Sequence, residues 1–508
     1  MFVRKKLNKS GLVSIQVIEK VAGKSRLVKT VGSSCDPAEI KDLFIRGKQL
    51  IPVLKGQTSF YFDKDNEDQL VNLFFNGIRE LSLVGPELLL GKLFNEIGFN
   101  AIKDELFRHL VLTRLCYPVS KLKTTDYLFK YKGISIDVER VYRYLDKLNH
   151  KQKEQIQNIS YVHTLKVLNN QMSIVFYDVT TLYFEAEQED ELRKTGFSKD
   201  GKHQQPQIVL GLLVSTGGHP LAYEIFDGKK FEGHTMLPVI EAFKAKYKLQ
   251  SMIVIADAGL MSNDNITELQ NKHYQYIIGA RIKNETKSIE KQILSAGLKN
   301  GESITIVKDE NSRIIISYSD ARAKKDAANR KRGLEKLEKN IAKGKLTKQH
   351  INNRGYNKYL KLEGDVKISI DKEKYSADAK WDGLKGYTTN TALTKEEIID
   401  NYNHLWHIEK AFRISKTDLR IRPIFHRLKR RIEAHICIAF CAYKVYKELE
   451  RQLKNKKANM SPEKAIEIAK TIYKITIQTN LSNTMHSRLY IDKEEQSHLL
   501  KLFDLQIG

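Results

Sequence analysis

Two runs of consecutive apolar residues stand out from the alternating hydrophobic and polar positions of this chain. The first runs from Ile174 to Tyr177 and is followed by Asp178, and the second, in SMIVIADAG, is followed by Asp257. A short continuous apolar run is typical of a strand that is buried on both faces of a sheet. The pattern therefore predicts two central strands, each of which ends in an aspartate.

The neighbouring segments predict that these strands belong to a mixed sheet. The first strand is followed by two strands with a glycine-rich turn between them, QPQIVLGLLV and PLAYEIF, and then by a helix, HTMLPVIEAFKAKY. The second buried strand, a helix and the strand YQYIIGARI complete the series. A hairpin combined with helical crossovers gives both antiparallel and parallel neighbours. This order predicts an α/β fold with a ribonuclease H-like mixed sheet.

The segment from Thr394 to Lys416 predicts a helix with one acidic side chain on its apolar face. Thr394 and Glu397 have the spacing of a capping box, which marks a helix start. Glu409 occupies one step of the apolar ladder, where a buried carboxylate is costly unless it is paired or binds a metal ion. The alternative is a glutamate at the edge of the ladder that pairs with a nearby Lys or Arg. The apolar steps of the ladder are Ile398, Tyr402, Leu405 and Phe412.

Asp178, Asp257 and Glu409 together form a candidate metal site. Ligand sites in open sheets gather at the carboxyl ends of strands, where the two aspartates are expected. Three neighbouring carboxylates repel one another unless they hold hard divalent cations, and Mg²⁺ prefers oxygen ligands. Alternatively, each aspartate caps a turn or the next helix. Asp227, in FDGKK, also ends a predicted strand and is a rival candidate.

The charge balance of the chain indicates a polyanionic partner. Lys and Arg number 86 against 61 Asp and Glu, which gives a formal charge of +25. Such an excess favours nucleic acid as a partner. The helical segments between 86 and 170, where basic residues alternate with Tyr and Leu, are interpreted as a DNA-binding unit or as a scaffold with a solvated basic face. The basic stretch that begins RAKKDAANRKRG is interpreted as a DNA-contacting arm or as a solvated helical hairpin.

Membrane and export signals are not found in the sequence. No apolar run reaches the roughly 18 residues that a membrane-spanning helix needs. The N-terminal stretch MFVRKKLNKSGLVSIQV lacks the long apolar core and the cleavage site of a signal peptide. We therefore expect a cytoplasmic protein with no membrane partner.

The acidic residues and their surroundings resemble the motifs of the DDE transposases of bacterial insertion sequences. YDVTTLYFE around Asp178 and VIADAGLMS around Asp257 are similar to the first and second carboxylate motifs of that family, and HIEKAFRISK is similar to the third. One group of the family has a Tyr-x2-Arg-x3-Glu-x6-Lys motif. This chain matches the motif except at the arginine position, where it has Leu405. This departure leaves open how the DNA end is held at that position. The corresponding residues here are Tyr402, Leu405, Glu409 and Lys416.

The resemblance implies a DNA transposase that binds terminal inverted repeats and catalyses strand cleavage and strand transfer. Asp178, Asp257 and Glu409 would be both the catalytic residues and the ligands of Mg²⁺, with two ions bound and with Mn²⁺ able to substitute. The partners would be double-stranded terminal-repeat and target DNA, and a second copy of the chain in a dimeric synaptic complex. This complex would act at the bacterial nucleoid.

The resemblance also implies contacts between the protein and DNA near the third carboxylate. Tyr402 and Lys416 would contact the terminal phosphates. Some relatives hold a flipped base with a tryptophan, and the tryptophans of this chain are Trp381 and Trp406, for which core packing is the alternative. The basic residues expected to contact DNA, together with Trp406, are Arg413, Arg420, Arg422, Arg430, Arg431, Lys324, Lys325, Arg330, Lys331 and Arg332.

The predicted organisation is a catalytic core that is interrupted by a mainly β insertion and flanked by smaller regions. The insertion is implied by the resemblance and fits the strand-rich segment before the Glu409 helix. The predicted segments are an N-terminal β-hairpin and helix region (1–85), a helical, DNA-binding domain (86–170), the first part of the core (171–283), the β-rich insertion with its basic helical arm (284–391), the second part of the core (392–450) and a helical C-terminal region (451–508).

Three other functions are compatible with parts of the sequence. A ribonuclease H-like nuclease that acts without transposition would use the same carboxylates. A transposase-derived DNA-binding protein without catalytic activity would keep the fold and the charge. An RNA-binding protein without enzyme activity would explain the charge but not the carboxylates.

Overall fold

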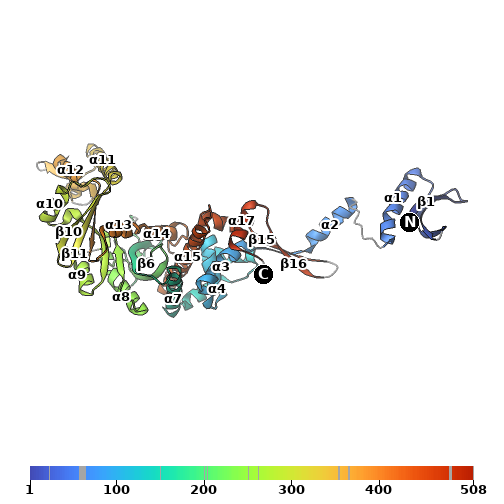
Figure 1. The fold of residues 1–508 in the computed structure, drawn as a ribbon, viewed down its shortest axis with the longest axis horizontal. Coiled ribbons are helices and arrows are strands. Elements are labelled where there is room, and N and C mark those ends of the chain that lie inside the picture. The colour runs from blue at the N-terminus through green and yellow to red at the C-terminus, as the bar shows by residue number, and fades with distance from the viewer. Residues whose placement is uncertain are drawn as a thin grey trace. The chain divides into compact units, whose positions relative to one another are not determined.

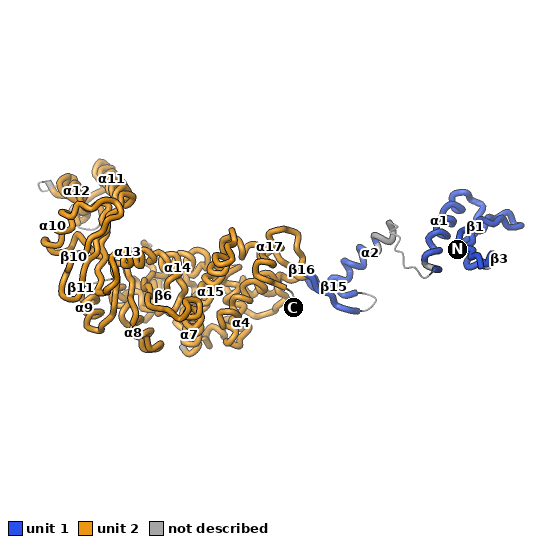
Figure 2. Tube along the Cα trace, in the orientation of Figure 1, with its two compact units in different colours: residues 1–81, 475–488 blue, residues 82–474, 489–508 orange. Residues whose placement is uncertain are grey.

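The computed structural model describes residues 1–21, 23–55, 64–148, 150–198, 201–202, 204–249, 251–260, 263–352, 355–363, 367–479 and 483–506. Contacts between residues divide the chain into two compact units (Figure 2). The first consists of Met1–Leu81 and Ile475–Arg488, and the second of Ser82–Lys474 and Leu489–Gly508. Among the described residues, no helix combines the length and the apolar character that crossing a membrane requires.

The first unit begins with a small antiparallel sheet covered by a helix, in which the predicted hairpin has a third strand. Strands β1 (Phe2–Leu7), β2 (Val13–Val21) and β3 (Lys24–Ser34) pair in the order β1-β2-β3. Helix α1 (Pro37–Leu54) packs on β2 and β3. Ile15 on β2 is fully buried, which gives this sheet one apolar face. Helix α2 (Lys64–Gly77) follows.

The C-terminal region, predicted as helical, has helices but also contains two strands. Between α16 (Pro462–Ala469) and α17 (Glu494–Phe503) lie the strands β15 (Tyr473–Gln478) and β16 (Met485–Tyr490). They form a three-stranded sheet with β4 (Ile78–Leu83), in the order β16-β15-β4. A strand is stable there because β4, which is far away in sequence, satisfies its backbone hydrogen bonds.

The second unit is built on an eight-stranded mixed sheet with the order β10-β11-β14-β9-β8-β5-β6-β7. Figure 1 labels three of its strands, β6, β10 and β11. β5, β8 and β9 run parallel to one another, and the other neighbours are antiparallel. The predicted hairpin β6–β7 and the crossovers through α8 (Met236–Tyr247) and α9 (Asn263–Asn271) are confirmed. The strands are β5 (Ile174–Tyr183), β6 (Gln207–Ser215), β7 (Pro220–Asp227), β8 (Ile253–Ala256), β9 (Gln275–Ala280), β10 (Ser303–Asp309), β11 (Ser312–Tyr318) and β14 (Leu384–Thr389).

The first buried strand does not end at Asp178, contrary to the prediction from the apolar run. β5 continues to Tyr183 because β6 pairs with it along this whole length, including Asp178 opposite Leu212. Its pairing with β8 does stop one residue before Asp178. The aspartate therefore lies where the neighbouring parallel strand ends, rather than where its own strand ends.

The segment that follows β9 extends this sheet. β10 and β11 form a hairpin, and β14 joins them to β9. The small hairpin of β12 (Leu360–Glu363) and β13 (Lys367–Ile370) forms a separate two-stranded sheet. The basic stretch forms the helix α11 (Asp320–Ala342), with α10 (Lys287–Ser295) before it and α12 (Lys372–Asp378) after it.

A helical layer shares its core with the sheet. The predicted helices of the 86–170 region are present, and the long helix α15 (Lys429–Asn455) packs against α3, α4, α6 and β7. Its side chains Ile436, Phe440 and Tyr443 are buried in one cluster with residues of both the sheet and the helices. The helices of this region are α3 (Lys92–Ile97), α4 (Glu105–Cys116), α5 (Lys121–Lys132), α6 (Val138–Lys147) and α7 (His150–Val167).

Candidate active site

Asp178 and Asp257 occupy neighbouring positions on two parallel strands. The β5–β8 pairing ends with Tyr177 opposite Ala256, so the next residue on each chain is an aspartate. Side chains alternate between the faces of a sheet, which places both aspartates on the face that carries Phe176 and Ile255. Asp178 is half-buried and Asp257 is exposed. The two carboxylates therefore belong to the same sheet face and the same end of β8.

The helix that carries Glu409 is broken, and the prediction of one continuous helix is wrong. α13 (Lys395–Asn403) begins with the predicted capping box at Thr394, but a turn at His404 and Leu405 separates it from α14 (Trp406–Thr417). α13 packs on β9 and β11, whereas α14 packs on β5 and β6. Because strands in a sheet are twisted relative to one another, two shorter helices follow the sheet better than one straight helix.

Glu409 lies in the first turn of α14 and is exposed. The buried side of α14 consists of Ile408, Ala411, Phe412 and Ile414, so Glu409 borders the apolar face instead of lying within it. The charge of Asp257 and, to a smaller extent, that of Glu409 add to burial in raising the pKa of Tyr402.

Tyr402 connects the broken helix to the end of β8. Its ring is buried, and its hydroxyl donates a hydrogen bond to Oδ1 of Asp257 at 3.3 Å. Burial, followed by the charge of Asp257, raises the pKa of the Tyr402 phenol. Gly279 on β9 leaves room for the hydroxyl, because a Cβ at this position would lie 2.5 Å from the hydroxyl oxygen. The phenol is therefore held as a hydrogen-bond donor beside Asp257.

Lys385 on β14 is a member of this site that sequence reasoning missed. Its Nζ lies 4.5 Å from the centroid of the Tyr402 ring and 5.2 Å from that of Tyr387. Burial, followed by the charge of Arg322, lowers the pKa of the lysine, and the charges of Asp257 and Glu409 oppose this. Strand alternation places Lys385 and Tyr387 on the same face, but no local pattern connects β14 with β8.

The residues expected to contact DNA fall into two groups. Several are already engaged within the protein: Arg330 is paired with Asp382, and Arg430 and Arg431 both donate hydrogen bonds to Asp146 on α6. Lys416 is half-buried in the last turn of α14, and the Arg422 guanidinium lies 5.9 Å from the Tyr183 ring centroid. The exposed members are Trp406, Arg413, Arg420, Lys324, Lys325, Lys331 and Arg332.

These positions bear on two open alternatives. Trp406 is 49% exposed, beside His407, and so is not a core residue. Asp227 caps a turn, because its Oδ1 accepts the backbone N–H of Lys229 at 3.0 Å. Asp178 and Asp257 also accept backbone N–H groups, from Val179 and Ala258. What favours Asp178 over Asp227 is that β5 pairs with β8, which places Asp178 beside Asp257.

The carboxylates suit a hard divalent cation by their chemistry and by the sheet face that they share. Carboxylate oxygens are the ligands that Mg²⁺ prefers, and it keeps several waters, so two or three protein ligands are enough. In the described part of the chain, however, no group of three or more His, Cys, Asp and Glu side chains is close enough together to hold a metal ion. Asp178, Asp257 and Glu409 thus supply the right donors without forming a closed ligand set.

Residues 169–444 match the family described as Transposase DDE domain. This match covers more than half of the 508 residues and includes the two aspartates, Glu409 and Lys385. The chain therefore belongs to the DDE transposase family. A search of curated proteins gives no match.

Two solved transposase structures are distantly similar to this chain. A cryo-EM structure of a piggyBac transposase synaptic complex with hairpin DNA has 8% sequence identity and a TM-score of 0.39, and the match covers 76% of this chain and 79% of that one. A Mos1 transposase paired-end complex with the left transposon end has 13% identity and a TM-score of 0.16, with 31% and 53% covered. Both TM-scores are too low for either likeness to support a fold or a function.

Proposed function

We propose that this protein is the transposase of a bacterial insertion sequence, which binds the terminal inverted repeats of its element and cleaves and joins DNA strands. The observation that carries the proposal is the placement of Asp178 beside Asp257, on the sheet face over which the Glu409 helix packs. In this proposal the sheet around these residues is a ribonuclease H-like catalytic core, and the segment 284–391 is its insertion.

The proposed reaction is metal-dependent hydrolysis and transesterification of phosphodiester bonds. Asp178, Asp257 and Glu409 would hold Mg²⁺, which, when two ions are bound, activates the attacking water or 3′-hydroxyl and stabilises the leaving oxygen. Tyr402 would fix the orientation of Asp257 through the hydrogen bond to Oδ1. The other oxygen of Asp257, Oδ2, has no hydrogen bond from a described residue, so it is the one we assign to the cation.

DNA would bind over the exposed cations that surround this face. A formal charge of +25 favours a polyanion, and phosphate contacts supply most of the affinity in such complexes. We assign Arg413 and Arg420 near α14, and the exposed cations of α11, to DNA. The helical region 86–170 is proposed as a further DNA-binding part, and two copies of the chain would pair two ends in the synaptic complex.

Cleavage of defined DNA ends tests this function. Purified protein is incubated with Mg²⁺ and either a duplex carrying the ends of its own element or a duplex with scrambled ends. We expect cleavage only at the element ends by wild type and none by Asp178→Asn or Asp257→Asn. Equal cleavage of both duplexes would favour a nuclease without transposition, and end-specific binding without cleavage would favour an inactive DNA-binding descendant.

A further inference from the structure

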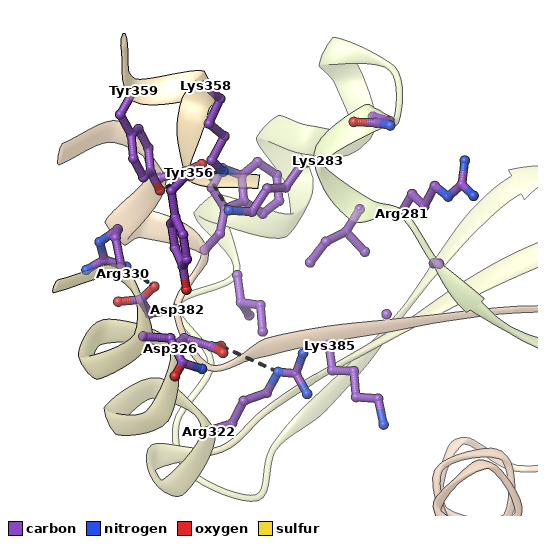
Figure 3. Close-up of a pocket in the computed structure, with 18 residues that line it drawn as sticks. Arg281, Lys283, Arg322, Asp326, Arg330, Tyr356, Lys358, Tyr359, Asp382 and Lys385 are labelled. Carbon is purple, nitrogen blue, oxygen red and sulfur yellow. Dashed lines mark hydrogen bonds and ion pairs between the residues drawn. The ribbon is translucent and has the colours of Figure 1, made fainter. Parts of the chain in front are cut away.

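A cavity of about 560 Å³ lies between the end of the large sheet and helix α11 (Figure 3). Its lining comes from β9, β14, α11 and the segment before β14. Lys385 and Arg322 lie toward one end of it, and Tyr359 and Lys358 lie toward the other. Lys385 lines this cavity and also lies over the Tyr402 ring beside Asp257. Lys385 is therefore shared between the lining of the cavity and the candidate active site.

Acidic side chains pair with most of the cations of the cavity. Asp378 pairs with Lys358 and with Lys283, and Asp382 pairs with Arg330. Asp326 lies 3.5 Å from Arg322. Among the described residues, Arg281 and Lys385 have no carboxylate within ion-pair distance. Arg281 instead donates a hydrogen bond to the carbonyl oxygen of Ala258, the residue after Asp257. Lys385 and Arg281 thus carry positive charge close to the residues that follow the ends of β8 and β9, without a direct ion pair to a described carboxylate.

The register of the sheet fixes where Lys385 lies relative to the two aspartates. Asp178 and Asp257 are level with each other, Gly279 on β9 is level with Asp257, and Tyr387 on β14 pairs with Gly279. These four positions form a row across the sheet. Lys385 is two residues from Tyr387, on the same face and about 7 Å from the row, beyond the end of β8. It therefore stands next to the carboxylates, toward the cavity.

We propose that Lys385 binds a backbone phosphate next to the scissile bond, and that Arg322 and Arg281 guide the same DNA strand toward the cavity. This inference rests on the proposed function, because it assigns a phosphate subsite to that reaction. A lysine ammonium is a compact point charge with three donors, which suits a single phosphate oxygen. A half-buried ammonium loses part of its hydration, and a phosphate at Lys385 would supply hydrogen bonds and a counter-charge in direct contact.

A purely structural role for Lys385 makes a different prediction. If the ammonium only balances Asp257 and Glu409 or packs on Tyr402, its removal would affect every DNA substrate equally. A phosphate ligand instead makes the effect depend on one position of the DNA. Neutralising the phosphate that Lys385 binds would then abolish the difference in cleavage rate between wild type and Lys385→Gln.

The test compares Lys385→Gln and Lys385→Arg with wild type on duplexes that carry a single methylphosphonate at successive positions beside the cleaved bond. Lys372→Gln is the matched control, since Lys372 is an exposed lysine at the start of α12. On unmodified DNA we expect Lys385→Gln to cleave about tenfold to a hundredfold more slowly than wild type, with Lys385→Arg in between and the control unchanged. At one methylphosphonate position, wild type and Lys385→Gln should cleave at the same rate.

The outcomes distinguish a failure of the phosphate subsite from a failure of the proposed function. Wild-type cleavage by Lys385→Gln, or a defect of equal size at every methylphosphonate position, would overturn the phosphate subsite while the transposase reaction stands. If Lys385→Gln does not fold, as judged by its thermal midpoint, the same position-dependence is measured with Lys385→Arg. Failure of wild type to cleave any element end would overturn the proposed function and this subsite together.

Discussion

The hydroxyl of Tyr402 donates a hydrogen bond to Oδ1 of Asp257 at 3.3 Å, and the backbone N–H of Ala258 donates to the same oxygen at 2.8 Å. Both donors orient one carboxylate oxygen and leave Oδ2 without a hydrogen bond from a described residue. Because burial and the charge of Asp257 raise the pKa of the phenol, Tyr402 remains a donor at neutral pH. This contact links α13, which leads to Glu409, with the strand end that carries Asp257.

Tyr402→Phe should slow DNA cleavage without unfolding the protein. The ring is buried and stacks edge-on against Tyr387 with centroids 4.8 Å apart, and Phe keeps these contacts. Loss of one hydrogen bond to a carboxylate corresponds to about 1 to 2 kcal/mol, so we expect a roughly fivefold to thirtyfold lower rate. Single-turnover cleavage measures this, together with a thermal midpoint close to that of wild type. An unchanged rate would show that the hydroxyl does not position Asp257.

Gly279→Ala should destabilise the protein through the same hydroxyl. The new Cβ would lie 2.5 Å from the Tyr402 oxygen and 3.2 Å from the backbone nitrogen of Ala258, so the tyrosine must move. Overpacking of this kind costs about 1 to 3 kcal/mol of the free energy of unfolding. Denaturant titration measures the loss.

The double variant Gly279→Ala, Tyr402→Phe is the control for this clash. Removing the hydroxyl makes room for the Cβ, so the double variant should be more stable than the sum of the two single effects predicts. Strict additivity of the two losses would show that Gly279 is needed for its backbone and not for the space it leaves.

Lys444 on α15 should make stability depend on pH above neutrality. This side chain is fully buried and donates hydrogen bonds to Thr164 and to the carbonyl oxygen of Ser160. Burial lowers its pKa to about 7, opposed by the charge of Glu448. The unfolded lysine has a pKa of about 10.4, so between these values the unfolded chain binds more protons and the folded state gains stability as the pH rises.

Lys444→Met removes this dependence. The difference in free energy of unfolding between wild type and the variant should shift in favour of wild type by up to about 1.4 kcal/mol per pH unit between about pH 7 and pH 9. Other titrating groups cancel in the difference. Denaturant titrations of both proteins across this range give the result, and parallel curves would show that the Lys444 amine is not held neutral by burial.

The exposed cations of α11 should contribute to DNA affinity through charge alone. Replacing Lys324, Lys325, Lys331 and Arg332 by glutamine should weaken binding regardless of sequence and reduce the dependence of log affinity on log salt by about 0.9 for each lost phosphate contact. Arg330→Gln is the contrasting variant on the same helix, because Arg330 is paired with Asp382 and should affect stability more than affinity. The affinity for DNA is measured at several salt concentrations. An unchanged slope of log affinity against log salt would show that α11 does not contact DNA.

The mixed sheet and its aspartates could be predicted because continuous apolar runs are local signals. The end of β5 could not, since β6 carries the strand past Asp178 through pairing that the local pattern does not show. The break between α13 and α14 was also hidden, because the apolar ladder continues through Leu405 and a capping box marks only the helix start. The alternation in Tyr473–Gln478 was a strand signal that the helical prediction overlooked.

The part of the candidate site that sequence reasoning missed depends on contacts between distant segments. Lys385 lies near Tyr402 only because β14 pairs with β9. A side chain at position 279 is excluded only because the Tyr402 hydroxyl packs against Gly279. Such contacts follow from sheet register and not from spacing within a motif. The three carboxylates remain a prediction from local motifs, and the side chains that orient and surround them could not be predicted from such motifs.

The most direct test of the central claim is Mg²⁺-dependent cleavage of a duplex carrying the ends of the element, by wild type and by Glu409→Gln. Glu396→Gln is the control, since Glu396 is an exposed glutamate in the first turn of the preceding helix. We expect Glu409→Gln to bind this DNA with the affinity of wild type but not to cleave it, while Glu396→Gln cleaves normally. Cleavage by Glu409→Gln at the wild-type rate would contradict the assignment of Asp178, Asp257 and Glu409 as the catalytic triad.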